Sequence, residues 1–411
     1  METEPLVFVG IDWATAAHQV CLTGTGNPVQ RSFPHDAGGI GAMVDWLCSQ
    51  AERPEQIAVG IETPHGPVVE ALMDRGIAVF AINPKQLDRF RDRLSPAGAK
   101  DDRRDALVLA SSLRTDRHCF RRVEALDPVV VELREWSRMA EELKQERGRL
   151  TNRIRQQLWR YYPQVLELAD DPGADWVLAL WDKAPTPTQA ARLTEKKVAS
   201  VLAAHRIRRV TAAEALSFLR RPALTVAPGT TEAATAHIAT IAKRLRLVNR
   251  QIKDVSHHID TLLGQLAEPG SEPGQEDEPR DAAILRSMPG VGTIVVAALL
   301  AEAPQAVRER NHEALRSLTG VAPVTIRSGK SWRVEMRQAC SHRLRNAVYH
   351  WARVATQHDE TSRKRYDALR ARGHSHGRAL RTVADRLLGV ACVMLEKGTV
   401  FDPAKATAGT R

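Results

Sequence analysis

The chain has 411 residues, enough for two to three domains of about 150 residues each. Hydrophobic residues make up 43% of it, which excludes a wholly disordered chain, and no apolar run reaches the roughly 18 residues of a membrane span. The 59 Lys and Arg residues exceed the 49 Asp and Glu residues, a net charge of +10 that favours a polyanionic partner, although a basic enzyme without one has the same balance. Five scattered cysteines without a CxxC pair, and an acidic start unlike a signal peptide, predict a cytoplasmic protein without disulfides or zinc.

Strand and helix signals alternate over the first 125 residues. Short β-branched runs predict strands at residues 6–11, 18–23, 31–33, 57–61 and 77–82. Helical spacing of apolar residues predicts helices at residues 40–51, 68–75 and 100–114. Three strands followed by two strand–helix pairs predict an α/β sandwich with a mixed sheet.

Two long helices are predicted next, at residues 128–162 and 231–266. Apolar residues of the second helix recur at alternating spacings of three and four over four heptads, from Ile238 to Leu266. This rhythm predicts a coiled coil, which is a device for bringing parts of the protein, or two copies of it, together. Prolines interrupt a helical insert at residues 169–229, to which the sequence assigns no role.

The sequence therefore divides into five predicted parts. An α/β domain covers residues 1–125, and the coiled-coil helices with their insert cover residues 126–267. An acidic segment rich in Pro and Gly, residues 268–280, has the composition of a flexible linker. A mainly helical domain follows at residues 281–398, and a disordered tail is expected at residues 399–411.

Acidic residues stand at two strand ends and on one helix of the first domain. Asp12 and Glu62 each follow a buried strand, at the edge of an α/β sheet where active sites gather. Asp102 and Asp105 are three residues apart and share a helix face. Four carboxylates in one cleft repel one another, so we expect them to hold a divalent cation, and their hard oxygen ligands suit Mg²⁺.

Two such ions about 4 Å apart stabilise the attacking and the leaving oxygens of a phosphodiester. Considered without the two strand-end acids, the predicted helix at residues 100–114 has a simpler interpretation, in which Asp102 and Asp105 are solvated charges paired with neighbouring arginines. Asp101 also makes the register ambiguous, but it lies off the Asp105 face, so Asp102 is preferred.

A glycine turn precedes an apolar helix in the last domain. The segment Pro289-Gly290-Val291-Gly292 is followed by apolar residues from Thr293 to Ala303. Such a turn presents backbone N–H groups at a helix N-terminus, where they bind phosphate without reading sequence. The alternative is a Gly-rich helix start without a ligand.

Ser328 lies in a short glycine-containing loop between Arg327 and Lys330. Further basic residues follow with a single acid, Glu335, among them: Arg333, Arg337, Arg343 and Arg345. Nearby cations lower the cost of a serine alkoxide and hold a phosphate, so these residues are candidates for a nucleophile and a nucleic-acid contact. The alternative is a surface hairpin with a serine in its turn.

Taken together, these motifs resemble one known family, the DEDD-type transposases of bacterial insertion sequences, also called bridge-RNA-guided recombinases. The resemblance rests on Gly-Ile-Asp12, Ile-Glu62-Thr, Asn83-Pro84 and Lys100-x-Asp102-x-x-Asp105 near the start of the chain, and on Pro289-Gly-Val-Gly292, Leu318-Thr-Gly-Val-Ala-Pro323, Arg327-Ser-Gly-Lys330 and Leu344-Arg-Asn-Ala347 near its end.

The resemblance implies an RNase H-like (RuvC-like) N-terminal domain in which Asp12, Glu62, Asp102 and Asp105 hold Mg²⁺, as two ions per site. The C-terminal domain would supply Ser328 as a nucleophile that forms a covalent 5′-phosphoserine link to DNA. Homodimers would place the serine of one subunit against the carboxylates of another and pair into a tetramer. A structured guide RNA would select the element ends and the target DNA.

Two departures from the family pattern bear on the site. Asp101 stands where Ser or Thr is more usual, and Lys330 stands where a second Gly is common. Ser331 is close enough to be the fallback nucleophile. The same residues are compatible with two other functions. One is a structure-selective nuclease in which metal-activated water attacks DNA, and the other is a non-enzymatic coiled-coil protein that binds nucleic acid.

Overall fold

The computed structural model describes residues 6–24, 26–94, 101–125, 127–268 and 280–402. The chain forms two compact units, Met1–Leu126 and Asp127–Arg411, and each is described by itself. Nearly all of the predicted linker and most of the predicted tail lie outside the described residues.

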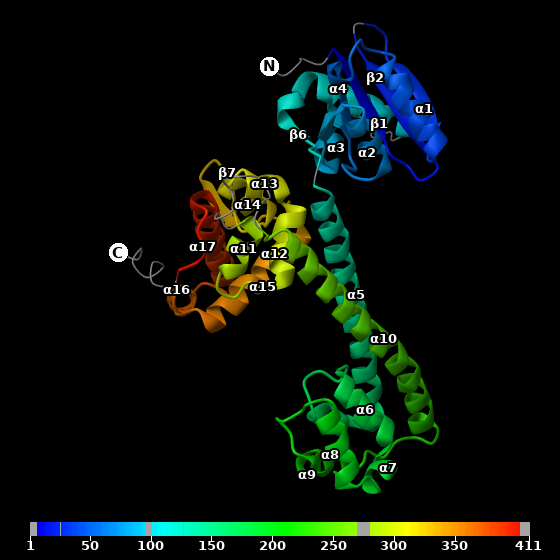
Figure 1. Ribbon diagram of the computed structural model, residues 1–411, viewed down its shortest axis with the longest axis vertical. Coiled ribbons are helices and arrows are strands. Elements are labelled where there is room, and N and C mark those ends of the chain that lie inside the picture. Colours follow the sequence, from blue (N-terminus) through cyan, green and yellow to red (C-terminus); the bar gives the residue numbers. More distant parts are fainter. Residues whose placement is uncertain (1–5, 25, 95–100, 126, 269–279, 403–411) are drawn as a thin grey trace. The chain divides into compact units, whose positions relative to one another are not determined.

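The first unit is built on a six-stranded sheet with the order β3-β2-β1-β4-β5-β6 (Figure 1). Strands β1, β4 and β5 are parallel, and β2, β3 and β6 join them antiparallel. The elements are β1 (Val7–Asp12), β2 (Ala17–Thr23), β3 (Val29–Pro34), α1 (Ala37–Cys48), β4 (Ile57–Ile61), α2 (Pro67–Asp74), β5 (Ala78–Ala81), α3 (Pro84–Leu94), α4 (Asp102–Asp116) and β6 (Arg121–Arg122).

Helices cover both faces of this sheet because strand side chains alternate between the faces. Val9 and Ile11 pack into a core with α1 and α2. Gly10 faces α4 instead, and a side chain there would lie only 2.0 Å from the Ala106 carbonyl oxygen, so the glycine lets the helix backbone approach β1. This mixed α/β sandwich is consistent with the RNase H-like domain that the resemblance implied.

The predicted mixed sheet and its helices are confirmed, with shifts of a few residues at the ends. The sequence interpretation missed α3, which begins at Pro84 directly after Asn83. Proline suits the first helical position, and the Asn83 side chain accepts the Lys85 N–H at 2.9 Å. The Asn83-Pro84 pair is the signal in the sequence for this helix start.

Two long helices, α5 (Pro128–Tyr161) and α10 (Thr230–Gln265), form the frame of the second unit. They run antiparallel: the Glu132 side chain meets His258, and Arg147 donates to Asn249 Oδ1 at 2.8 Å. The helical prediction is confirmed. The sequence left open whether the Ile238 to Leu266 stripe joins parts of one chain or two copies of it. In the structure, α5 of the same chain buries most of that stripe.

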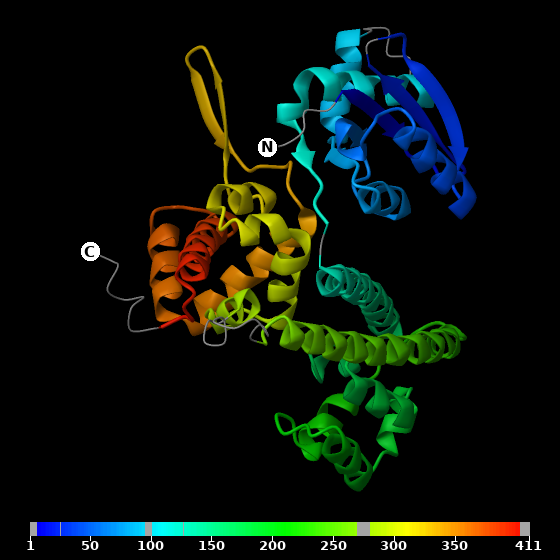
Figure 2. The ribbon, with the colours of Figure 1, turned by 45° about the horizontal axis from the view of Figure 1, so that its top comes forward.

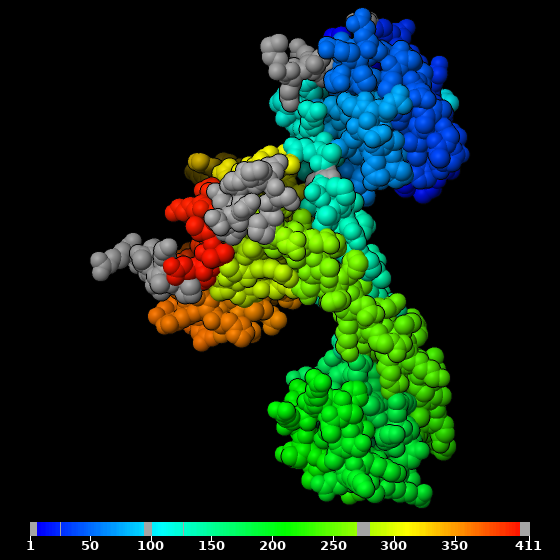
Figure 3. All heavy atoms as spheres, viewed as in Figure 1, coloured from blue at the N-terminus to red at the C-terminus, as the bar shows by residue number. Residues whose placement is uncertain are grey.

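The insert forms a compact lobe at one end of this helix pair (Figure 3). It consists of η3 (Pro163–Glu167), α6 (Asp175–Lys183), α7 (Pro187–Ala191), α8 (Glu195–Ala204) and α9 (Ala212–Leu219). At the opposite end, the chain continues into the C-terminal helices. These are α11 (Asp281–Ser287), α12 (Thr293–Glu302), α13 (Pro304–Arg308), α14 (His312–Leu318), α15 (His342–His358), α16 (Glu360–Ala371) and α17 (His376–Lys397).

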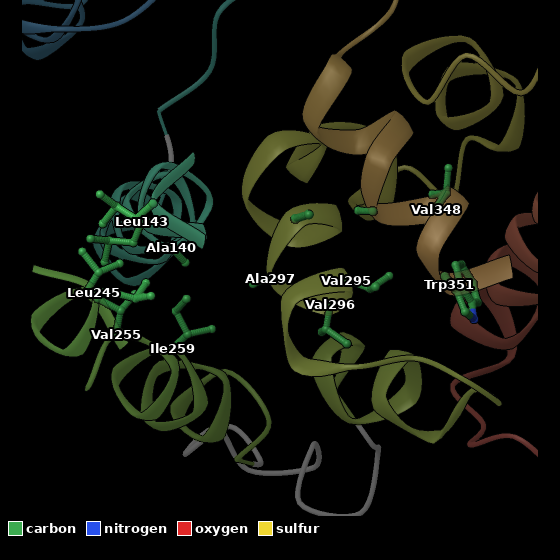
Figure 4. Close-up of a cluster of buried hydrophobic side chains, with 14 of the residues drawn as sticks. Ala140, Leu143, Leu245, Val255, Ile259, Val295, Val296, Ala297, Val348 and Trp351 are labelled. Atoms are coloured by element: carbon green, nitrogen blue, oxygen red, sulfur yellow. The ribbon is translucent and has the colours of Figure 1, made fainter. Parts of the chain in front are cut away.

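Helix α12 joins the long helices to the C-terminal ones. Every residue from Val295 to Ala301 is buried, so this helix has no solvent face along that stretch. Side chains from α5, α10, α12 and α15 belong to one continuous core, of which Leu143, Val296 and Trp351 are members (Figure 4). Within the described residues, no helix combines the length and the apolar character that a bilayer crossing needs.

Candidate active site

Asp12 and Glu62 come from neighbouring strands. Ile11 pairs with Ile61 in the parallel register of β1 and β4, so the residues that follow them stand side by side at the carboxyl edge of the sheet. Asp12 lies two residues after Gly10, and Glu62 lies two residues after Gly60, so each acid shares a sheet face with its glycine. Both glycines face α4. The two acids therefore belong to the α4 side of the sheet, at its carboxyl edge.

Helix α4 brings its first turn toward the same edge. Gln30 donates to the Arg103 carbonyl at 3.1 Å, and Arg114 donates to the Gly24 carbonyl at 3.4 Å. Gln30 lies at the level of Gly10, and Gly24 follows Thr23, which pairs with Phe8 near the start of β1, so α4 runs antiparallel to β1. Its N-terminal turn, which carries the predicted acids, is the part nearest to the strand ends.

The ambiguity between Asp101 and Asp102 has a structural account. Asp101 is the N-cap of α4, and its side chain accepts the Arg104 N–H at 2.8 Å, which satisfies one of the unpaired donors of the first turn. Asp102 is the first helical residue, is exposed and lies three residues before Asp105. Asp101 thus serves the helix start, and the choice of Asp102 as the metal ligand stays a prediction.

Asp105 is buried, with 3% of its surface exposed, and it already has a cationic partner. Arg91 on α3 donates from Nε to Asp105 Oδ1 at 2.8 Å and also pairs with Asp88 at 2.6 Å. The hydrogen bond to Asp105 is the largest of the effects that raise the pKa of Arg91 above its usual value. Sequence reasoning missed Arg91 because it missed α3.

These acids fit a divalent cation by chemistry, since carboxylate oxygens are the ligands that Mg²⁺ prefers. Their arrangement does not complete a site: among the described residues, no three Asp, Glu, His or Cys side chains are grouped closely enough to hold a metal ion. Asp12 and Glu62 are adjacent, whereas the Asp105 carboxylate is engaged by Arg91. The convergence of all four acids on metal stays a prediction.

Ser328 stands at the tip of a two-stranded hairpin in the second unit, β7 (Val324–Ser328) and β8 (Ser331–Glu335). Gly329 and Lys330 form its turn, and Gly329 has a φ of 55°, as the first turn residue of a type II′ hairpin requires. Ser328 pairs with Ser331 across the strands, so both hydroxyls lie on one face of the exposed tip. The surface hairpin that was the simpler interpretation is what the structure contains, and it presents both candidate nucleophiles.

The predicted basic residues lie in three places, two of which are at the hairpin. At the tip, Arg327 and Lys330 are exposed and form no ion pair with any described residue, while Arg333 pairs with Glu335 at 3.0 Å. Below the hairpin, Arg345 donates to the Arg337 carbonyl at 2.6 Å. Arg327 and Lys330 therefore place positive charge without an acidic partner among the described residues beside Ser328.

Arg343 belongs elsewhere. It forms a 3.3 Å ion pair with Glu141 on α5, in a pocket of about 390 Å³ between α5, α12 and α15. Lys144 and His350 also line this pocket, and burial is the main cause that lowers the pKa of each. The structure thus separates Arg343 from the hairpin arginines with which the sequence grouped it.

The structure adds two basic residues that sequence reasoning missed, Arg378 and Arg381 on α17. Burial, followed by repulsion from Arg345 and Arg378, lowers the pKa of Arg381 below its usual value. Arg381 donates to Met336 Sδ at 3.2 Å, just beyond β8, and the buried Arg345 Nε has no hydrogen-bond partner among the described residues. These cations form a cluster at the base of the hairpin, the basal arginine cluster (Arg345, Arg378, Arg381).

The glycine turn has a packing role. Gly290 has a φ of 74°, and a side chain there would lie 2.6 Å from the Ala355 backbone nitrogen on α15. Gly292 is the N-cap of α12, and Asp260 accepts a hydrogen bond from Thr293 at that helix start. A carboxylate thus lies beside the turn, and the phosphate contact of Gly290 and Gly292 stays a prediction.

Comparisons with known proteins identify the family. A transposase family model matches residues 9–163, and the model of the IS116/IS110/IS902 transposase family matches residues 282–367. A protein assigned as the transposase of the Streptomyces coelicolor IS117 mini-circle is 32% identical over 98% of this chain and 97% of its own length. The Streptomyces coelicolor IS110 protein of 43.6 kDa is 28% identical over 96% of this chain and 95% of its own length.

A Sinorhizobium fredii protein, y4uE, also assigned as a transposase, is 57% identical over 206 residues, which are 49% of this chain. Those residues cover 57% of that relative, so the match spans just over half of its length. Because the similarity to the IS117 protein extends over nearly all of both chains, this chain belongs to the IS110/IS116/IS902 family of insertion-sequence transposases.

Proposed function

We propose that this transposase cuts and rejoins DNA at the ends of its insertion sequence through a covalent serine intermediate, with Ser328 as the nucleophile. The observation that carries the proposal is the hairpin tip, where Ser328 is exposed and lies between Arg327 and Lys330, two cations without ion pairs among the described residues. A DNA phosphate is the anion that complements them.

In the proposed reaction, Ser328 Oγ attacks the phosphorus of a phosphodiester and loses its proton to a base. The bond from phosphorus to the 3′-oxygen breaks, that oxygen takes up a proton, and a 5′-phosphoserine ester remains. Arg327 and Lys330 stabilise the extra negative charge of the pentavalent phosphorus. Because the phosphoester bond is kept rather than hydrolysed, a different 3′-hydroxyl can attack it and rejoin the strand.

The proposed role of the four carboxylates is to hold a divalent cation, taken to be Mg²⁺. Asp12 and Glu62 supply neighbouring ligands at the strand ends, and Asp102 and Asp105 supply ligands from the first turn of α4. The ion, when bound, would polarise the phosphate and favour the serine alkoxide. Arg91 would then have to release or share Asp105, because its guanidinium occupies one of the carboxylate oxygens.

Partners are proposed on the same basis. Ser328 and the four acids belong to different units of the chain, and in the proposed assembly one subunit's serine works with another's carboxylates, as in the family's arrangement. The net charge of +10 suits both element DNA and a structured guide RNA. Because α5 buries the α10 stripe, a homodimer or tetramer would have to form through other surfaces.

The test is a denaturing assay for covalent protein–DNA adducts. The full chain is expressed together with its flanking DNA, so that any guide transcript is present, and is mixed with labelled element-junction DNA and Mg²⁺. We expect an adduct that disappears in Ser328→Ala and with a chelator, and that persists in Ser331→Ala. Adduct loss only in Ser331→Ala would move the nucleophile to Ser331. Cleaved DNA without an adduct in any protein would contradict the proposal and favour the water-using nuclease.

A further inference from the structure

We propose that Trp332 stacks on a DNA base next to the phosphate that Ser328 attacks, so that the hairpin both binds the strand and unstacks it. This inference rests on the proposed function, in which the hairpin contacts DNA. It assigns a positioning role to a side chain that neither the sequence motifs nor the comparisons single out.

Trp332 is the most exposed large hydrophobic side chain of the described residues, at 69% of its surface. Its side chain makes no ring contact or hydrogen bond with any described residue, and the hairpin that carries it extends away from the C-terminal helices (Figure 2). Val334 and Ile326 on the same hairpin are also exposed. A lone two-stranded hairpin with this much apolar surface in water points to a partner.

The register places the indole next to the nucleophile. Trp332 pairs with Arg327, and the neighbouring pair toward the tip is Ser328 with Ser331. Successive pairs point to opposite faces, about 3.3 Å apart along the strands. The aromatic ring and the serine hydroxyl are thus one strand step apart on opposite faces, an arrangement that holds a base on one side while a phosphate reaches the tip.

The charges favour nucleic acid over protein as the partner. Glu335 is the single acid on the two strands, and it is paired with Arg333, so Arg327 and Lys330 leave a net positive tip. Basic residues interleaved with an exposed aromatic ring are typical of surfaces that bind the backbone and stack the bases of a distorted or single strand. A second copy of this chain also has a net charge of +10, so it offers no general attraction for that tip.

The first experiment maps the contact. Junction DNA with 5-iododeoxyuridine at the bases flanking the cut phosphate is irradiated with full-length protein, and crosslinked peptides are located by mass spectrometry. The Ser328→Ala protein is used so that cleavage does not remove the base. We expect the crosslink on Trp332. A crosslink mapped reproducibly to another segment, with none on Trp332, would overturn the proposal.

The second experiment compares three variants of the full chain. Trp332→Ala should weaken binding to junction DNA about tenfold, as the loss of one base–aromatic stack does, and Trp332→Phe should restore most of it. Trp159→Ala is the matched control, because that indole on α5 is equally exposed, at 65%, and should change nothing. Melting curves of each variant report folding independently.

The outcomes separate this inference from the function on which it rests. Normal DNA binding and adduct formation in Trp332→Ala would refute the stacking role and leave Ser328 chemistry intact. No adduct in the wild type, with the crosslink still on Trp332, would refute the serine chemistry and keep the base contact. A changed oligomeric state in Trp332→Ala with unchanged DNA affinity would make the hairpin a protein-docking arm and overturn the proposal.

Discussion

Arg91 Nε lies 2.8 Å from Asp105 Oδ1, so the most buried of the four predicted metal ligands is neutralised by an arginine of the same unit. Both side chains are largely shielded, at 14% and 5% exposure. A carboxylate in such a place needs a cation, and either the guanidinium or a metal ion can supply it. Arg91 and metal are therefore expected to compete for Asp105.

Arg91→Gln tests this competition. Without metal the variant leaves Asp105 uncompensated, and we expect its free energy of unfolding to fall by about 3 kcal/mol. Added Mg²⁺ should raise the melting temperature of the variant by more than that of the wild type. Arg93→Gln is the control, because Arg93 pairs with Asp116 at a half-exposed site and should matter by less than about 1 kcal/mol. An equal response to Mg²⁺ in all three proteins would contradict the competition.

Gly290 and Gly292 are expected to respond differently to the same substitution. Gly290→Ala combines a φ of 74° with a clash against the α15 backbone, and we expect it to destabilise the second unit by more than about 2 kcal/mol. Gly292→Ala meets nothing within 4 Å, and as an N-cap substitution it should cost less than about 1 kcal/mol. Urea unfolding of both variants makes the comparison. A normally stable Gly290→Ala protein with weakened DNA binding would instead support the phosphate contact.

His18 should make the first unit sensitive to acid. Burial, and secondly the neighbouring His35, lowers the pKa of His18 from its ordinary value of 6.5, so the folded state holds the neutral ring. The unfolded state binds the proton more readily, so stability is fully present above pH 6.5 and decreases as the pH falls below it, by up to about 1.4 kcal/mol per pH unit.

Urea midpoints at about pH 5 and about pH 8 measure this dependence. His18→Gln should flatten the difference between the two midpoints, whatever it does to stability at the higher pH. His65→Gln, at an exposed position, should keep the wild-type difference. An unchanged pH dependence in His18→Gln would assign the acid sensitivity to other groups.

The basal arginine cluster should bind phosphate. Arg381→Gln removes a cation that its neighbours repel, so we expect normal stability together with weaker DNA binding. If Arg381 contacts one phosphate, the slope of log affinity against log salt should become shallower by about 0.9. Arg250→Gln, an exposed position on α10, is the control. An unchanged salt slope in Arg381→Gln would remove this cluster from the DNA-binding surface.

Sequence patterns predicted the strands and helices of this protein whose apolar residues recur at regular spacings. Asp12 and Glu62 could be predicted as neighbours because parallel strands end at one edge. The α10 heptad identified a buried face, but a period does not identify what covers it, and α5 of the same chain does. The roles of Arg91, Arg378 and Arg381 could not be predicted, because the residues that each arginine contacts depend on which helices pack together. Trp332 could not be singled out either, because only the structure shows how exposed its ring is.

The antiparallel course of α5 and α10 has a mechanical consequence. The chain leaves along α5, builds the insert lobe and returns along α10, so the start of α5 and the end of α10 lie together, as Glu132 and His258 do. The lobe stands about 50 Å from that junction, at roughly 1.5 Å for each of the 34 residues of α5. Removing a matched length from both helices would shorten the helix pair and bring the lobe closer to that junction. The helices around α12 would keep their contacts.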